Sequence, residues 1–324
     1  MKISIDVGYS QVKAIAENGR RVLFPSVQAS VTNDPTVGMF KSEIGHRVEI
    51  LSLPNPRKEL VGDAALRSLT ATSTLSRKKS SDMHDLFILT AAYLCGASGI
   101  TQLAVGLPLA FYRFQKDELK SRLESLTAHM QVNDGPKKHI AISTASVYPQ
   151  GAGVLLSNGL NITKEGKIGL IDIGYYTTDF LMFEVINGMP NPIAELCGSI
   201  DTGIHLVSKS LSNVYQEETG SLAPKFLLND IIANKPIQFE GRRLNIRIDT
   251  IYERVAQQIM QEVSSVWGKQ TELIDQTILA GGGTLMLKRY LSFPNLVTPS
   301  DPVFANAEGF LYMISSKTQS EKAK

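Results

Sequence analysis

Two short segments of the chain repeat a motif that is suited to binding phosphate. Ile5-Asp6-Val7-Gly8-Tyr9 recurs half a chain length later as Ile171-Asp172-Ile173-Gly174-Tyr175. Each copy combines an apolar strand-like run, an aspartate, one apolar residue, a glycine turn with hydroxyl side chains, and a second strand-like run that closes at Asn-Gly. One such turn alone could simply contain common turn residues. Because both copies share the same order, the sequence favours a duplicated lobe, with each copy presenting one loop to a common ligand.

The residue types in these loops indicate phosphate held together with a metal ion. Glycine lets backbone N–H groups approach an anion closely. Lys13 adds a cation, and hydroxyl donors are present in both turns: Ser10, Thr177 and Thr178. Asp6 and Asp172 would repel phosphate unless a hard cation lay between them. We therefore expect Mg²⁺ near both aspartates, held mostly through water.

A glutamine between the two copies is a candidate for positioning water. The segment 146–155 contains Pro149 and Gln150, followed by the small residues 151–153. We expect Pro149 to open a helix and the small residues to allow close approach of another element. A glutamine is a poor base but can orient an attacking water. The alternative is that Gln150 is an ordinary exposed residue of a helix's first turn.

A third glycine-rich turn lies near the end of the chain. An apolar run beginning at Thr277 leads into Gly281, Gly282, Gly283 and Thr284. A flat ligand could lie directly on this backbone, because glycine has no side chain to block it. Three glycines alone fit a flexible loop equally well.

The elements around these motifs follow from hydrophobic periodicity and turn signals. The predicted strands cover 2–7, 11–16, 21–24, 46–51, 103–105, 140–142, 167–173, 179–186 and 276–279. The predicted helices cover 82–94 (capped by Asp82), 116–129, 203–216, 249–267 and 306–315. Asn18-Gly19 and Asn187-Gly188 are hairpin signals, the first assigned to a type I′ turn. Alternating strands and helices predict α/β lobes.

The length of 324 residues exceeds what one hydrophobic core usually serves, which predicts two lobes. We expect the first lobe at 1–150 plus 303–324, with a small inserted subdomain at about 25–81. The second lobe is expected at 151–302, with an outer subdomain at about 206–268.

The composition excludes several classes of protein. A net charge of +2 gives no reason to expect electrostatic capture of nucleic acid or of a membrane. Cys95 and Cys197 make neither a disulfide framework nor a zinc spacing. The five histidines form no paired motif, and His84 and His129 are expected in helices. No signal peptide precedes the first strand and no apolar run approaches ~20 residues, so we expect a cytoplasmic protein.

Five segments, in this order, resemble the signature segments of the actin-fold ATPases, the superfamily of actin, sugar kinases and heat-shock chaperone ATPases. They are 5–13 and 170–179 (two phosphate loops), 146–155 and 304–309 (two connections between lobes), and 278–285 (the adenosine motif). The segment Gly174-Tyr-Tyr-Thr-Thr-Asp179 and the compact length resemble the plasmid-segregating ParM/StbA group and archaeal actin-like proteins. The resemblance implies an actin-like (ribonuclease H-like) duplicated fold, with two lobes closing around a Mg–nucleotide.

The resemblance also implies roles for individual residues. Asp6 and Asp172 would organise Mg²⁺, and Gln150 would position the attacking water; several bacterial members have glutamate there, whereas actin has glutamine. The phosphates of ATP (or GTP) would be held by Gly8, Tyr9, Ser10, Gln11, Lys13, Gly174, Tyr175, Tyr176, Thr177, Thr178 and Asp179. Asp201 and Gly203 would lie near the ribose, and Gly281, Gly282, Gly283 and Thr284 against the adenosine. Glu217 or Glu218 are further candidates for gripping ribose and base.

Three functions are compatible with this site. The resemblance implies a filament-forming ATPase that moves DNA through a separate DNA-binding adaptor, without binding nucleic acid itself. A small-molecule kinase of the same fold would need a carboxylate base near its acceptor, normally an aspartate. No carboxylate adjoins Gln150 in sequence, although Asp179 or Asp201 remain candidates. A non-polymerising nucleotide switch is the third possibility, although no substrate-binding domain follows.

Overall fold

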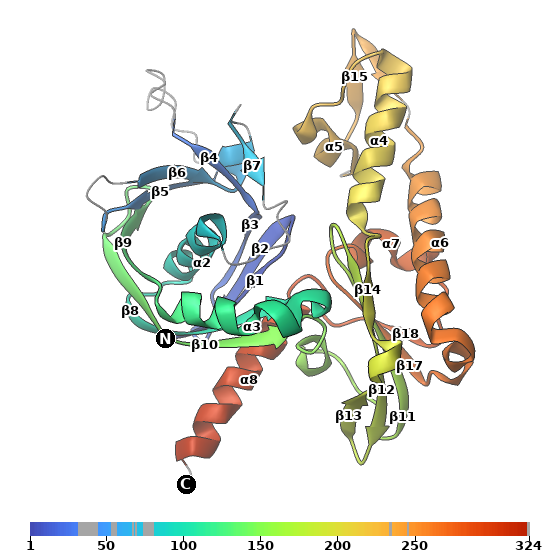
Figure 1. The fold of residues 1–324 in the computed structure, drawn as a ribbon. Helices are drawn as coiled ribbons and strands as arrows, with labels where there is room; N and C mark the ends of the chain where they lie inside the picture. Colours follow the sequence, from blue (N-terminus) through green and yellow to red (C-terminus); the bar gives the residue numbers. More distant parts are fainter. Residues whose placement is uncertain are drawn as a thin grey trace. The chain divides into compact units, whose positions relative to one another are not determined.

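The computed structural model of the chain describes residues 1–31, 45–52, 57–66, 68, 70–73, 81–232, 235–244 and 246–322. The chain divides into two compact units, the first comprising Met1–Asn158 and Phe304–Lys324 and the second Gly159–Val303. The first unit therefore extends beyond the predicted boundary at residue 150. Each unit is built from one main sheet with helices against it (Figure 1).

The first unit contains a ten-stranded sheet in the order β3-β2-β1-β8-β10-β9-β5-β6-β4-β7. In chain order, its strands are β1 (Lys2–Val7), β2 (Gln11–Ala16), β3 (Arg21–Pro25), β4 (Val27–Ser30), β5 (His46–Ile50), β6 (Arg57–Val61), β7 (Thr72–Ser73), β8 (Gly99–Leu107), β9 (Thr127–Val132) and β10 (Lys138–Pro149). The sheet curls around one helix of its own unit, α2 (Asp82–Leu94) (Figure 1).

The helices of the first unit cover both faces of this sheet. They are α1 (Asp63–Leu66), α2, α3 (Leu109–Glu124), α8 (Ala305–Lys322) and the short 3₁₀ helix η1 (Val154–Leu156). α2 and α3 share a core with alternate residues of the central strands, including Ile5 and Leu103. α8 packs on the other face, where Phe310 lies against Ala104. The central strands are therefore buried on both sides, as expected for strands paired in parallel.

The second unit contains a six-stranded sheet in the order β13-β12-β11-β17-β18, with β14 also paired to β12. Its strands are β11 (Gly166–Ile173), β12 (Thr178–Ile186), β13 (Met189–Pro192), β14 (Gly198–Ile200), β17 (Gln276–Ala280) and β18 (Leu296–Val297), and β15 (Ile237–Phe239) and β16 (Arg242–Leu244) form a separate hairpin. The helices are α4 (Ile204–Thr219), α5 (Lys225–Ile232), α6 (Ile248–Trp267), α7 (Thr284–Leu287) and the 3₁₀ helices η2 (Ala194–Leu196), η3 (Gly268–Leu273) and η4 (Lys288–Tyr290). α4 and α6 form a core with the sheet around the buried Trp267.

The two units repeat one strand topology. In each sheet, three consecutive strands form an antiparallel meander, and two further strands lie beside the first strand of the meander and run parallel to it. The order β3-β2-β1-β8-β10 in the first unit thus corresponds to β13-β12-β11-β17-β18 in the second. The two copies of the aspartate–glycine motif lie at the equivalent hairpins, β1–β2 and β11–β12. The predicted duplicated α/β fold is therefore confirmed.

Several local predictions need correction. The helix predicted at 116–129 is α3, which ends at Glu124, and His129 lies in β9, where its ring stacks on His139 of β10. The segment 127–132 alternates exposed and buried residues, which is the period of a strand. The cap of α2 is Ser81, whose hydroxyl accepts the N–H of His84, and not Asp82. Pro149 is the last residue of β10 and not the start of a helix.

The Asn18-Gly19 hairpin is not a type I′ turn. That turn needs positive φ at both central residues, but only Gly19 has it, with φ of 81°. The Asn18 side chain instead donates to the carbonyl of Cys95 and accepts the N–H of Arg20. At the second hairpin both residues have positive φ, 52° for Asn187 and 75° for Gly188. Both Asn-Gly pairs therefore lie between antiparallel strands as predicted, but the type I′ assignment at Asn18-Gly19 is wrong.

An inserted subdomain was predicted at about 25–81. The described part of this segment contributes the strands β4 to β7 to the ten-stranded sheet and also forms the short helix α1. The rest of that segment (32–44, 53–56, 67, 69 and 74–80) lies outside the described residues. In the part of the chain that the structure describes, no helix combines the length and the apolarity that a membrane crossing requires.

Small residues bring α8 against the loop that follows β10, as the sequence predicted for 151–153. A Cβ atom on Gly309 would lie 1.8 Å from the carbonyl oxygen of Gly153, so no larger residue fits there. Asn306 accepts the N–H of Gly151 at 2.8 Å. This contact holds the residues immediately after Gln150 in a defined conformation.

Candidate functional site

The first hairpin brings three of the predicted residues together. Asp6 and Lys13 are register partners on β1 and β2, and Lys13 Nζ lies 3.3 Å from Asp6 Oδ2. Gln150 donates from Nε2 to the other carboxylate oxygen, Asp6 Oδ1, at 2.8 Å. Gln150 comes within reach because β10 and β1 both pair in parallel with β8, so their carboxyl ends meet at one edge of the sheet. Asp6 is buried, with 4% of its surface exposed.

The glycines of the two hairpin turns, Gly8 and Gly174, allow a close approach of the backbone. Gly8 donates its N–H to the carbonyl of Gln11 at 3.0 Å, and Gly174 donates to Thr177 at 2.9 Å. A Cβ atom would lie 3.0 Å from the first of these oxygens and 2.9 Å from the second. Neither glycine has a positive φ. The sharp turn expected from glycine therefore comes from the absence of a side chain and not from a left-handed backbone.

The second hairpin places two carboxylates opposite each other. Asp172 and Asp179 are register partners on β11 and β12, so their side chains share one face of the strand pair. Both are buried, with 9% and 3% of their surfaces exposed. Like charges in this position repel each other. This arrangement favours a cation near Asp172.

Two threonines that the sequence predicts at the ligand donate their hydroxyl hydrogen bonds to backbone carbonyls of the second unit. Thr178 donates to the carbonyl of Thr202 at 2.7 Å, and Thr284 donates to the carbonyl of Ala280 at 2.6 Å. Both threonines are buried, with at most 1% of their surfaces exposed. Their hydroxyl groups tie the loops to neighbouring segments. Two other predicted donors of this hairpin, Tyr176 and Thr177, are half-buried. Partial burial, and secondarily the neighbouring Tyr175, raise the pKa of Tyr176, so its phenol stays protonated and can donate a hydrogen bond.

The beginning of α4 is attached to the second hairpin. The N–H groups of Ile204 and His205 donate to the carbonyls of Gly174 and Tyr175, at 3.2 Å and 2.7 Å. A Cβ atom on Gly203 would lie 2.6 Å from the Tyr175 carbonyl oxygen, which explains why glycine stands there. The His205 ring lies 5.1 Å from the Tyr176 ring, a contact that the sequence analysis missed. Asp201, predicted near the ribose, is exposed at the start of this segment.

The three glycines after β17 have different environments. Gly281 has a φ of 82°, and a Cβ atom there would lie 2.4 Å from Asp172 Oδ1. Gly283 donates to the carbonyl of Ile173, and its Cβ would lie 2.3 Å from the Ile173 side chain. Gly282 has no atom within 4 Å of its Cβ position. Two glycines are thus packed on β11, and Gly282 presents the open side that a flat ligand would need.

We expect Gly281→Ala to lower the free energy of unfolding by about 1–3 kcal/mol, because alanine would have to adopt a left-handed φ against a carboxylate. Gly282→Ala is the matched control and should cost less than about 1 kcal/mol. Urea denaturation of both variants measures the difference. Equal destabilisation by the two substitutions would contradict this assignment.

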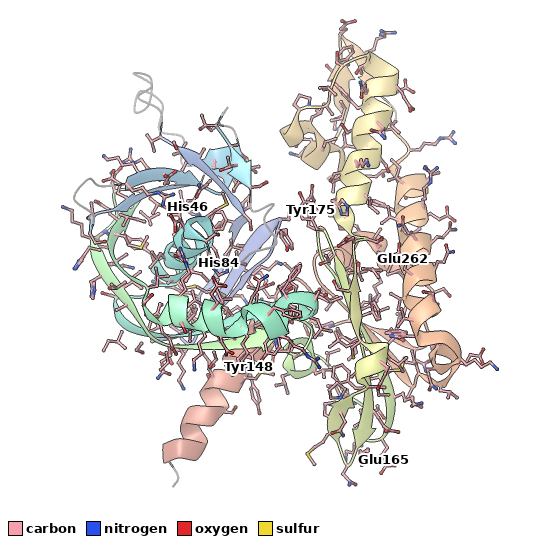
Figure 2. The ribbon with its side chains drawn as sticks, in the orientation of Figure 1. His46, His84, Tyr148, Glu165, Tyr175 and Glu262 are labelled. Atoms are coloured by element: carbon pink, nitrogen blue, oxygen red, sulfur yellow. The ribbon has the colours of Figure 1, made fainter. Side chains whose placement is uncertain are left out.

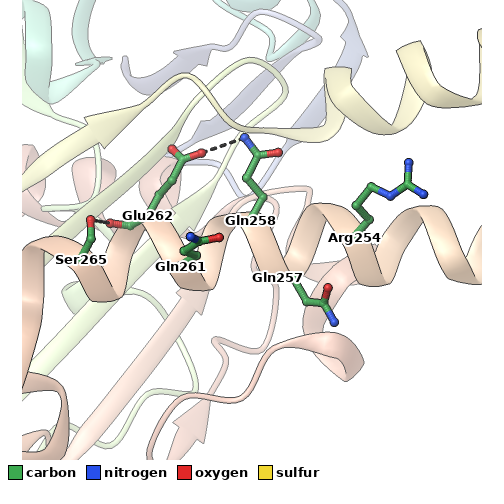
Figure 3. A pocket seen from close by; sticks show the side chains of 6 residues that line it. All are labelled: Arg254, Gln257, Gln258, Gln261, Glu262 and Ser265. Carbon is green, nitrogen blue, oxygen red and sulfur yellow. Dashed lines mark hydrogen bonds between the residues drawn. The ribbon is translucent and has the colours of Figure 1, made fainter.

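A polar cluster on α6 was not found from the sequence. Glu262 Oε1 accepts from the Thr202 hydroxyl at 2.9 Å and from Gln258 Nε2 at 2.8 Å. Figure 3 shows the side chains that line a pocket at this helix face: Arg254, Gln257, Gln258, Gln261, Glu262 and Ser265. These residues recur at intervals of three and four along the chain, so they lie on one face of the helix. That spacing is the sequence signal by which the cluster could have been found. Glu217 and Glu218 are exposed on α4 and do not line this pocket.

The carboxylates suit a magnesium ion that arrives with a nucleotide. Across the described ranges, no three His, Cys, Asp or Glu side chains form a group that could hold a metal ion. Mg²⁺ is usually bound through one or two carboxylates, with water and substrate phosphates completing its shell. Asp6 in the first unit and Asp172 beside Asp179 in the second are buried anionic groups of this kind. Each unit therefore has a buried carboxylate of the kind that fits Mg²⁺ bound together with phosphate.

The chain resembles known proteins over both units. Residues 4–153 match a family model described as the N-terminal domain of actin-like proteins, and residues 170–292 match one described as the C-terminal part of archaeal actin homologues of the MreB type. An archaeal actin homolog of Thermoplasma volcanium is 27% identical over 331 aligned positions, covering 95% of this chain and 97% of that protein. The homolog of Thermoplasma acidophilum is 26% identical with the same coverage.

Two solved structures show the same fold. A 15-stranded ParM filament from Clostridium botulinum has a TM-score of 0.88 at 25% identity, covering 97% of this chain and 99% of that one. An archaeal actin homolog in complex with ADP has a TM-score of 0.82 at 21% identity, covering 98% and 99%. With the two family matches and the duplicated topology, these findings show that the chain belongs to the actin-like superfamily. Within it, the chain is close to the ParM proteins and the archaeal actin homologues.

Proposed function

We propose that this chain binds and hydrolyses Mg–ATP and assembles into filaments that segregate DNA, such as a plasmid, through a DNA-binding adaptor. The observation that carries the proposal is the pair of equivalent hairpins, each with a buried aspartate before a glycine turn. The relatives support it, because one is a ParM filament and another holds ADP.

The phosphates are assigned to the two hairpins. Backbone N–H groups at 9–11 and 175–177 donate to phosphate oxygens, and Lys13 offsets the phosphate charge. Asp6 and Asp172 would hold Mg²⁺, which would neutralise the phosphate charge. The Lys13–Asp6 contact at 3.3 Å supports this role, because it keeps the ammonium beside the turn before the nucleotide arrives.

Gln150 is assigned to the attacking water. Its amide nitrogen is held by Asp6 Oδ1 at 2.8 Å, and the amide oxygen is therefore the group that accepts a hydrogen bond from water. Orienting water in this way favours hydrolysis and requires no general base. The segment 146–155 around Gln150 contains no aspartate or glutamate that could serve as the base of a kinase. We therefore favour an ATPase over a small-molecule kinase.

The nucleoside is assigned to the second unit. Gly282 offers open backbone to the adenosine, and the linked side chains of Thr202, Gln258 and Glu262 offer acceptors and donors for ribose hydroxyls. Thr202 stands between Asp201 and Gly203, which the family resemblance places near the ribose. A backbone contact does not discriminate between adenine and guanine, so GTP is a competing substrate to be tested.

Light scattering of the purified protein with phosphate release measured in the same cuvette tests the proposal. We expect scattering to rise above a threshold protein concentration on addition of Mg–ATP and to decay as phosphate accumulates. ATP with EDTA is the control, and GTP is run in parallel. Phosphate release with flat scattering would remove the filament from the proposal and leave the ATPase. Absence of both nucleotide binding and phosphate release would overturn it.

A further inference from the structure

The first phosphate hairpin is held in place by a buried serine that the motif analysis did not single out. Ser26 lies between β3 and β4 and is fully buried, with 0% of its surface exposed. Its hydroxyl donates to the carbonyl of Gly8 at 2.7 Å. Its backbone N–H donates to the carbonyl of Ser10 at 2.8 Å. One residue therefore fixes two carbonyl groups of the turn.

Fixing a carbonyl also fixes the next N–H group along the chain. A trans peptide is planar, and its C=O and N–H point in opposite directions. The described peptide bonds are all trans. The hydrogen bond from Ser26 to the Gly8 carbonyl therefore turns the N–H of Tyr9 away from Ser26. An anion is attracted by N–H groups and repelled by carbonyl oxygens. The orientation of the peptide between Gly8 and Tyr9 therefore decides whether an anion on the side away from Ser26 meets an N–H group or a carbonyl oxygen.

In the second hairpin, too, the carbonyl of the turn glycine accepts a hydrogen bond from outside the hairpin, but from a different element. There the carbonyls of Gly174 and Tyr175 accept the backbone N–H groups of Ile204 and His205 at the start of α4. Gly8 and Gly174 are equivalent in the duplicated motif, and the carbonyl of each is held from outside its own hairpin. In the second unit backbone amides do this, whereas in the first unit it depends on a single side-chain hydroxyl.

We propose that Ser26 is a positioning residue for the nucleotide phosphates, acting by holding the Gly8 carbonyl so that the N–H groups of the first turn face the phosphate. The proposal rests on the proposed function of this turn as a phosphate loop. It assigns to Ser26 an effect on binding of the phosphate chain and no effect on binding of the nucleoside.

The test compares Ser26→Ala with Ser4→Ala. Ser4 is a matched control, because it lies on β1 of the same unit, is 0% exposed, and has a hydroxyl without a hydrogen-bond partner among the described residues. Affinities for Mg–ATP and Mg–ADP are measured by calorimetry, and adenosine affinity by competition. We expect Ser26→Ala to bind both nucleotides about tenfold more weakly, the effect of losing one buried hydrogen bond, with adenosine affinity unchanged. Ser4→Ala should match the wild type in all three.

Two results would overturn the proposal. One is a Ser26→Ala variant that binds Mg–ATP like the wild type, and the other is an equal loss of ATP and adenosine binding, which would indicate a general structural role. If Ser26→Ala does not fold, Ser26→Cys, similar in size with a weaker donor, must show the same selective loss. Failure of the wild type itself to bind ATP would instead contradict the proposed function.

Discussion

Replacement of Asp172 by alanine is expected to abolish Mg²⁺-dependent binding of ATP, with a loss of affinity of about a hundredfold or more. The variant removes a buried carboxylate from the end of β11, next to the glycine turn. Because Asp172 faces Asp179 across the strand pair, the substitution also removes a repulsion between like charges. We therefore expect the thermal stability of the nucleotide-free protein to stay the same or to rise.

Calorimetric titration with Mg–ATP, together with a thermal melt, measures both effects. Glu165→Ala is the matched control, since Glu165 is an exposed carboxylate of the same unit that lies at the opposite end of the sheet from Tyr175 (Figure 2). It should leave binding unchanged. Wild-type affinity in Asp172→Ala would show that this carboxylate has no part in holding Mg²⁺. A lower melting temperature would show that Asp172 stabilises the fold.

Substitution of Gln150 by alanine should separate binding from hydrolysis. We expect nucleotide affinity to remain within about threefold of the wild type, since only one contact beside the phosphate loop is lost. Phosphate release should slow by about a hundredfold, because the attacking water is no longer oriented. In the scattering assay, filaments formed with Mg–ATP should then persist longer than those of the wild type. Single-turnover phosphate release gives the rate directly.

Gln150→Glu tests how the glutamine acts. A carboxylate keeps an acceptor for water but cannot donate to Asp6 Oδ1 as Gln150 Nε2 does at 2.8 Å. Hydrolysis retained in Gln150→Glu and lost in Gln150→Ala would assign the role to water orientation. Loss in both variants would show that the hydrogen bond to Asp6 is the important contact. A normal hydrolysis rate in Gln150→Ala would show that the assignment of the attacking water is wrong.

The residues of the two hairpins could be predicted from the sequence because the interactions that form them are local. β1 and β2 begin and end where the alternation of apolar residues and the glycine turn indicate. Asp6 and Asp172 each stand one residue before the end of a buried strand, so their positions follow from short-range pattern alone. Recurrence of that pattern was also enough to predict the duplication.

Where local preference and tertiary pairing disagree, the prediction failed. The helix was predicted to continue to His129, but residues 127–132 alternate polar and apolar side chains and form β9, which pairs with β5 and β10 on both sides. Asn18 carries a type I′ signal, but its side chain bonds to Cys95 far along the chain. Nothing in either segment indicates the partner that decides its conformation.

By itself, then, the sequence determined the two aspartate–glycine hairpins and the glycine turn after β17, since a strand, a tight turn and a residue without a side chain are encoded within a few positions. Only the tertiary structure decided which distant residues meet them. Gln150 reaches Asp6 because β8 lies between β1 and β10, and Ser26 reaches Gly8 because β3 lies beside β2. Glu262 reaches Thr202 from α6 in the same way. Such contacts depend on the order of strands and the packing of helices, which are set by the burial of the whole core and not by the residues near each site.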